Sequence, residues 1–242
     1  MSGTRFEVRG SGKTGRASLK NEGDFMKNGY RMLKNYADTY FIEKKSKFIT
    51  YVQPIYSEEE ALQFLGSIRK KHYDASHNCY AYILGESMNI QRSSDDGEPS
   101  STAGVPILEV LKKEEVTNSI IIVTRYFGGI MLGTGGLIRA YTEGAARGIK
   151  AAGTVRVQPF AVHQLIMDYS FLSKLQYEIP KKDYIIDNIE YLENVTMRVL
   201  TTVDLGNAFI EDIAQWTNGC IEVESLGEQM LKIDDASGEI LK

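Results

Sequence analysis

The chain has 242 residues, of which 43% are hydrophobic and 25% charged, and its formal net charge is −4, as in an ordinary globular protein of one or two domains. Its two cysteines, Cys79 and Cys220, exclude a disulfide framework and a tetrahedral cysteine metal site. No apolar run approaches the ~20 residues needed to cross a bilayer, and the N-terminus lacks the pattern of a secretion signal, so we expect a cytoplasmic protein that does not span a membrane.

The first 31 residues differ from the rest of the chain. They carry seven basic and three acidic residues, several glycines and few large apolar side chains. Such a segment buries too little surface to offset its chain entropy, so we expect a disordered basic leader over residues 1–31. It is either an arm for nucleic acid or an over-extended start, with the initiator at Met26 or Met32. Without it the chain has 21 basic and 29 acidic residues, a balance that opposes indiscriminate binding to phosphate backbones.

Residues 32–158 show predicted strands and helices that suit one α/β domain. In chain order these are a strand at 40–52, a helix opened at Ser57 by a capping box, a strand at 78–84, a short helix from Gly104, a strand at 118–124 and a long helix from 136 to 153. The continuous apolar run at 118–124 is typical of a strand that is buried on both faces.

We place a domain boundary at Pro159, because a new order of elements begins beyond it. The predicted elements there are a strand at 161–168, a helix at 170–179, strands at 184–191 and 195–202, a helix at 207–217 and a strand at 221–231. This βαββαβ order predicts a ferredoxin-like fold, with four antiparallel strands under two helices. The chain is therefore predicted to be α+β, with a first domain at 32–158, a ferredoxin-like domain at 159–233 and a tail at 234–242.

Two loops of the first domain carry the residues that we expect to form a site. The first loop, residues 95–104, concentrates Asp95, Asp96 and Glu98 before three hydroxyl residues, in a segment too rich in glycine and proline for a helix or strand. Its carboxylates suit a hard cation, but their spacing does not match a calcium-binding loop. A turn in which the aspartates bond neighbouring amides explains the same residues, so no metal is predicted.

The second loop, residues 125–136, places glycines between an apolar strand and a helix. The first amides of that helix, together with Arg125 and Arg139, suit a phosphate or carboxylate, whereas close packing of strand and helix is the alternative reason for the glycines. Neither loop has a P-loop or dinucleotide-binding sequence, so no cofactor is predicted. The ligand-binding candidates of the two loops are Asp96, Glu98, Ser100, Thr102, Arg125, Tyr126, Phe127, Gly128, Gly129, Gly133, Gly135, Gly136 and Arg139.

Catalytic signals are weaker. His77 and Cys79 are two residues apart on a predicted strand and therefore share a face, ~6.6 Å apart along it. A Cys–His pair needs closer contact, and a cysteine in an apolar strand is more often inert packing. If the protein is an enzyme, its catalytic candidates are Asp95, Asp96, Glu98, His77 and Cys79. Tyr126 and Phe127 beside Arg125 also suit the stacking of single-stranded RNA or a peptide.

The order and spacing of these motifs resemble the IMPACT family, specifically its bacterial YigZ-type members. The resemblance covers about residues 36–155, and residues 77–82, 94–99, 125–129 and 135–141 carry it. The rest of the chain resembles the small C-terminal domain of the bacterial members. Ser101 stands where the family usually has glycine, and Met131 where a basic residue is common.

The resemblance implies both a fold and a cellular role. The N-terminal domain would share the fold of the second domain of a small-subunit ribosomal protein and of domain IV of elongation factor G, and the C-terminal domain would resemble the last domain of that factor. Eukaryotic relatives regulate translation under amino-acid starvation, using an extra N-terminal domain, and some bacterial members have been labelled proline dipeptidases.

Two functions from different classes follow. The first is a non-catalytic, translation-associated or stress-regulatory factor that presents both loops to RNA, the ribosome or a ribosome-bound protein. The second is a metal- or anion-dependent hydrolase, a peptidase or phosphoesterase, that uses the same cleft. Both hypotheses require the acidic loop and the glycine loop to fold against each other.

Overall fold

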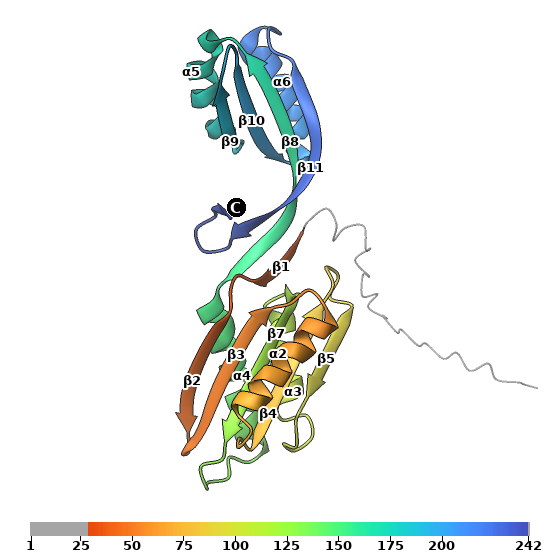
Figure 1. The fold of residues 1–242 in the computed structure, drawn as a ribbon, viewed down its shortest axis with the longest axis vertical. Coiled ribbons are helices and arrows are strands. Elements are labelled where there is room, and N and C mark those ends of the chain that lie inside the picture. Colours follow the sequence, from red (N-terminus) through yellow and green to blue (C-terminus); the bar gives the residue numbers. More distant parts are fainter. Residues whose placement is uncertain (1–28, 242) are drawn as a thin grey trace, which may run out of the picture.

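The computed structural model describes residues 29–241, which form two α/β lobes joined by a pair of long strands (Figure 1). The two-domain α/β organisation is confirmed. Most of the predicted leader lies outside the described residues, but Tyr30 and Arg31, which we placed in it, belong to strand β1 (Tyr30–Leu33). Met32 explains the difference, because its side chain is 1% exposed and packs against Val155 and Val157.

A five-stranded antiparallel sheet forms the N-terminal domain. Its order is β2-β3-β7-β4-β5. The strands are β2 (Ala37–Glu43), β3 (Ser46–Pro54), β4 (His77–Leu84), β5 (Ile90–Ser94) and β7 (Ser119–Tyr126). The helices are α2 (Glu58–Lys71), α3 (Gly104–Lys113) and α4 (Thr134–Ala152). The predicted helices are all present, whereas β5 was not predicted.

Both faces of this sheet are covered by helices. Helix α2 packs on one face, where Ile120 and Ile122 of β7 join its core, and α3 and α4 pack on the other, around Ile121 and Val123. Strand β7 is therefore buried on both faces, as its continuous apolar run predicted. The predicted capping box is also observed: Ser57 accepts from the Glu60 amide, and Glu60 accepts from the Tyr56 amide.

The prediction of one strand over residues 40–52 was wrong. A two-residue turn at Lys44 and Lys45 splits this segment into β2 and β3, which pair from Ala37 with Val52 to Glu43 with Ser46. Both lysines adopt positive φ, 45° and 66°, as the tight turns of hairpins require. Glycine and asparagine usually supply that conformation, so this segment carries no turn signal.

The second sheet carries the C-terminal domain. Strand β8 (Thr154–Met167) lies between β10 (Val195–Thr202) and β11 (Val223–Asp234), and β9 (Ile185–Tyr191) pairs with β10, all antiparallel. Helices α5 (Tyr169–Glu178) and α6 (Gly206–Thr217) contribute Leu175 and Phe209 to the core beside this sheet. Two 3-10 turns, η1 (Ile179–Lys182) and η2 (Val203–Leu205), complete the domain. The predicted βαββαβ order is thus observed.

Pro159, which we took as a boundary, lies inside the continuous strand β8. Residues 154–157 pair with β1, and residues 160–167 pair with β10. Pro159 falls between these two partners, where its missing N–H breaks neither ladder. Strand β11 follows β8 along its length and turns back through β12 (Ile240–Leu241), so part of the predicted tail forms a hairpin. β1 also pairs with the short strand β6 (Val116–Thr117).

Ion pairs hold that hairpin on the N-terminal domain. Arg31 donates to Asp235 at 2.6 Å, Lys34 pairs with Asp234, and the Thr154 hydroxyl donates to Asp235 at 2.7 Å. A hollow of about 650 Å³ lies beside these residues, next to the C-terminal end of α4. No helix within residues 29–241 is long and apolar enough to span a bilayer.

Candidate functional site

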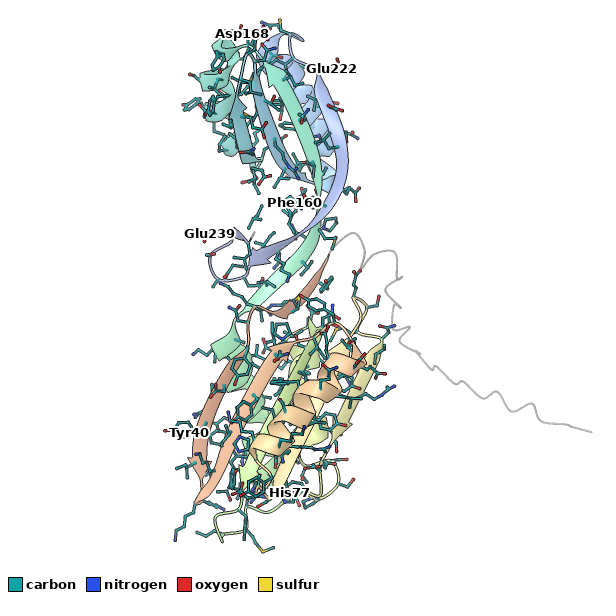
Figure 2. The ribbon with its side chains drawn as sticks, viewed as in Figure 1. Tyr40, His77, Phe160, Asp168, Glu222 and Glu239 are labelled. Carbon is teal, nitrogen blue, oxygen red and sulfur yellow. The ribbon has the colours of Figure 1, made fainter. Side chains whose placement is uncertain are left out.

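The two predicted loops meet at one end of the five-stranded sheet. The acidic loop follows β5, the glycine loop follows β7, and His77 at the start of β4 marks the same end (Figure 2). Glu98 joins them: its Oε1 accepts from Arg125 at 2.6 Å and from the Tyr141 hydroxyl of α4 at 2.7 Å. The hollow beside Arg31 and Asp235 lies at the other end of α4, so it does not belong to this junction.

The Glu98–Arg125 pair is an internal contact. The side chains of Glu98 and Arg125 are 3% and 6% exposed. Arg125 also contacts Ser46 Oγ at 3.3 Å and stacks over the Phe48 ring. Its guanidinium therefore holds β3, β7 and the acidic loop together, and it is not free to bind an external phosphate as we had suggested.

The two aspartates also make structural bonds. Asp95 accepts from the amides of Ser101, Ala103 and Gly104, and so caps the start of α3 from outside the helix. Burial tends to raise the pKa of Asp95, but these amide bonds outweigh it and the pKa is lowered. Asp96 accepts from Arg69 at 2.8 Å and from the Asn78 amide at 2.7 Å.

These contacts leave the carboxylates pointing to different partners. Asp96 has φ of 43° and Gly97 of 88°, which turns the chain sharply between Asp95 and Glu98. Among residues 29–241, no three histidine, cysteine, aspartate or glutamate side chains are grouped so that they could hold a metal ion. The turn explanation of the acidic loop therefore accounts for its residues.

His77 and Cys79 point to separate partners. His77 Nδ1 bonds the Asp96 carbonyl at 2.9 Å, whereas the Cys79 thiol donates to the Asp95 carbonyl at 2.9 Å, and its sulfur lies 3.4 Å from the Tyr141 hydroxyl. Burial raises the pKa of the Cys79 thiol, and Tyr141 opposes this only in part. Because the thiolate is the nucleophile, a thiol held in its protonated form packs rather than reacts.

The glycine loop is the exposed part of this end of the domain. Phe127, Ile130 and Met131 are 52%, 42% and 84% exposed, while Leu132 is buried beneath them. A Cβ on Gly128 would lie 2.0 Å from the carbonyl carbon of Lys45, so glycine is needed for the contact between this loop and the β2–β3 turn. Of the predicted ligand residues, the exposed ones are Ser100, Phe127, Gly129, Gly133, Gly135 and Arg139, and the others are Asp96, Glu98, Thr102, Arg125, Tyr126, Gly128 and Gly136.

Comparison with known proteins gives the relatives of this chain. Its residues 44–149 match the model of the Impact N-terminal domain, and residues 165–219 match a domain of unknown function, DUF1949. It is 39% identical to the IMPACT family member YvyE of Bacillus subtilis over 82% of this chain and 92% of that protein. The chain belongs to the IMPACT family.

This IMPACT protein is also similar to two further proteins. The IMPACT family member YigZ of Escherichia coli is 34% identical over 76% of this chain and 92% of its own length. The crystal structure of a hypothetical protein is 31% identical and superposes with a TM-score of 0.52 over 82% of this chain and 98% of that one. Both loops lie inside the residues that match the Impact N-terminal domain.

The IMPACT domain contains a second polar cluster that the sequence did not reveal. His72, which ends α2, bonds the Tyr51 hydroxyl through Nε2 at 2.6 Å and the Tyr126 hydroxyl through Nδ1 at 2.9 Å. Tyr126 in turn donates to Asp74 at 3.0 Å. One tautomer satisfies all three bonds, with Nδ1 donating to Tyr126 and Nε2 accepting from Tyr51. These residues come from α2, β3, β7 and a loop, so no sequence motif links them.

Stability of this IMPACT protein is expected to fall as the pH drops from 7 towards 5. Burial lowers the pKa of His72, as does Lys71, although Asp74 opposes them, and burial also lowers the pKa of His163. As the pH falls, the histidines of the unfolded chain bind protons first, near the ordinary histidine pKa of about 6.5. The stability that the two neutral histidines contribute is therefore fully present above that pH and is lost as the pH falls below it. Urea unfolding followed by circular dichroism across this range measures the loss.

The variant His72→Gln serves as the control for that pH dependence. Glutamine does not titrate, so its unfolding is expected to depend less steeply on pH than that of the parent protein, whatever its overall stability. An equal slope in both proteins would show that His72 does not contribute.

Proposed function

We propose that this protein is a translation-associated factor that docks on the ribosome, its RNA or a ribosome-bound protein through the loop end of its N-terminal domain. Membership of the IMPACT family supports the translation link, because the family's eukaryotic members, as noted above, regulate translation. We also propose that its N-terminal domain shares the fold of domain IV of elongation factor G, and its C-terminal domain the fold of the last domain of that factor. The protein would act in the cytoplasm and take part in stress regulation.

The observation that carries this proposal is the exposed apolar tip of the glycine loop. Phe127, Ile130 and Met131 stand in solvent on a segment fixed by the buried Arg125 and Leu132 on either side. Exposed apolar side chains grouped on a rigid support mark interaction surfaces, and aromatic residues and methionine are enriched in such interfaces. Docking of a preformed loop also costs less conformational entropy than docking of a flexible one.

The acidic loop supports binding rather than hydrolysis. Asp95 is held by three amides, Asp96 by Arg69 and an amide, and Glu98 by Arg125 and Tyr141. General acid–base chemistry needs a carboxyl group within reach of a substrate proton. Here the carboxylates are occupied by the bonds that shape the loop, so their role in the proposal is to fix the platform on which the exposed tip stands.

Sedimentation of lysate through a sucrose gradient tests the proposal. The parent protein is expected to travel with ribosomal particles at low salt, and Met131→Ser is expected to weaken this association about fivefold, the effect of losing about 1 kcal/mol at an interface. Met230→Ser is the matched control, because Met230 is also exposed but lies on β11 of the C-terminal domain. A parent protein that stays at the top of the gradient, with and without amino-acid starvation, contradicts the proposal.

A further inference from the structure

Lysine and tyrosine side chains lie beside α2, on the part of that face of the N-terminal sheet that α2 does not cover. Strand β2 is an edge strand, and α2 crosses the sheet without reaching it (Figure 1). We call this surface the shelf. Its residues are Tyr40 of β2, Lys44 and Lys45 of the β2–β3 turn, Lys47 of β3, Lys70 and Lys71 of α2, and Tyr73.

The strand register places the side chains of β2 and β3 on the same face as α2. Tyr40 is paired with Ile49, and Ile42 with Lys47, so these four residues share one face. Ile49 belongs to the core under α2, which identifies that face. Tyr40 is 66% exposed and projects from the outer edge of the sheet (Figure 2). Lys47 lies beside it, with Nζ 5.3 Å from the centre of its ring.

The end of α2 continues the same surface. Lys71 Nζ lies 4.8 Å from the centre of the Tyr51 ring, and Tyr73 is 87% exposed. Besides burial, Lys71 and Lys47 lower the pKa of His72, so the ammonium groups of α2 and β3 both lie near that histidine. The backbone of Lys45 lies against Gly128 of the glycine loop, which places the β2–β3 turn at the loop end of the sheet.

The charge of the shelf is opposite to that of the whole chain. Five of its residues are lysines, while the formal net charge of the protein is −4. The neighbouring acids are Glu43, which is exposed at the turn, and Asp74, which accepts from Tyr126. Arg69 is paired with Asp96 and is therefore not counted with the free cations. A local concentration of lysines in an acidic protein indicates a specific polyanionic ligand rather than general attraction.

We propose that the shelf binds single-stranded RNA, with bases stacked on Tyr40 and Tyr73 and phosphates held by Lys44, Lys45, Lys47, Lys70 and Lys71. Exposed aromatic rings interleaved with lysines on an open sheet match the chemistry of a single strand, whose unpaired bases offer flat faces and whose backbone carries the charge. This inference goes beyond the proposed function, because it assigns a second surface with a ligand of its own.

Fluorescence anisotropy with a labelled single-stranded RNA of mixed sequence and the purified full chain tests the inference. Lys47→Gln/Lys71→Gln is expected to weaken binding about tenfold and to reduce the slope of log K against log salt by about 1.4, which is about 0.7 for each lost phosphate contact. Tyr40→Ala is expected to weaken binding and leave that slope unchanged, because stacking is not a charge contact.

Matched variants separate the shelf from general effects. Lys113→Gln/Lys150→Gln removes the same charge from exposed positions on α3 and α4, and Tyr191→Ala removes an exposed tyrosine from β9. Both are expected to bind RNA as the parent protein does. The inference is overturned if the parent protein does not bind the RNA, or if the shelf variants bind it as well as these controls do.

The same reagents distinguish this inference from the proposed function. Met131→Ser is expected to weaken ribosome association and keep RNA binding. Loss of ribosome association in the shelf variants, without any RNA binding by the parent protein, would indicate a protein ligand and overturn the RNA assignment. RNA binding without ribosome association would count against the proposed function and would still support RNA binding at the shelf.

Discussion

Replacing Arg125 with methionine is expected to lower the free energy of unfolding of the N-terminal domain by about 3–5 kcal/mol. The substitution leaves the Glu98 carboxylate 3% exposed with only the Tyr141 hydroxyl, at 2.7 Å, as a close donor. His77 Nε2 is 3.8 Å away, too far for a good hydrogen bond. An ion that loses its partner inside a protein keeps the cost of its lost hydration, and this cost dominates the effect.

Two readouts make this prediction specific to one domain. The chain has one tryptophan, Trp216, which lies in α6 of the C-terminal domain. Arg125→Met is therefore expected to shift the urea transition seen by circular dichroism and to change the Trp216 fluorescence transition much less. The double variant Arg125→Met/Glu98→Gln removes both charges and keeps an acceptor for Tyr141, so it is expected to recover much of the loss. A loss below about 1 kcal/mol in the single variant, typical of exposed pairs, would contradict the buried role of this pair.

Local signals in the sequence predicted most of the helices and the C-terminal topology. Ser57, recognised as the start of a capping box, caps α2, so this helix begins where a side chain can bond its first free amides. The βαββαβ order was also readable, because alternating apolar residues in β8 and β10 face the core built with α5 and α6. In each case the cause of the structure lies within a few residues of its signal.

Errors arose where the structure depends on partners far along the chain. The turn at Lys44 and Lys45 has no glycine, and it is supported by Gly128, which packs against the Lys45 backbone from more than eighty residues away. Pro159 suggested a boundary, yet it is accommodated because β8 changes its partner from β1 to β10 at that point. A single sequence carries no local record of these pairings.

The two loops of the candidate site could be picked out from the sequence, but the roles of their residues could not. Two loops with unusual composition were recognised, and the structure brings them together at Glu98 and Arg125. The same polar residue types serve an exposed ligand or an internal network, and only burial separates the two cases. Burial made Arg125 an internal partner, while the bare apolar residues Ile130 and Met131, which were not ligand candidates, became the exposed tip.

Gly148→Ala is expected to destabilise the N-terminal domain by about 1–3 kcal/mol, because α4 packs on β3 with no space for a methyl group. A Cβ at this position would lie 2.5 Å from Val52 Cγ1 and 2.8 Å from Thr50 Cγ2, and both residues are fully buried. A Cβ on Gly144, one turn earlier, would lie 2.9 Å from Thr50 Oγ1. The two glycines thus set the distance between helix and sheet, and through it the position of Tyr141 against Glu98.

The matched control is the same change on the other side of the sheet. Gly66 lies within α2, and a Cβ there would meet nothing within 4 Å. Gly66→Ala is therefore expected to stabilise the domain by about 0.5–1 kcal/mol, the gain in helix propensity. Urea unfolding followed by circular dichroism gives both values. Because the propensity gain applies equally at Gly148, the difference between the two variants measures the packing cost alone, and two stabilising substitutions would mean that α4 does not contact β3 through its glycines.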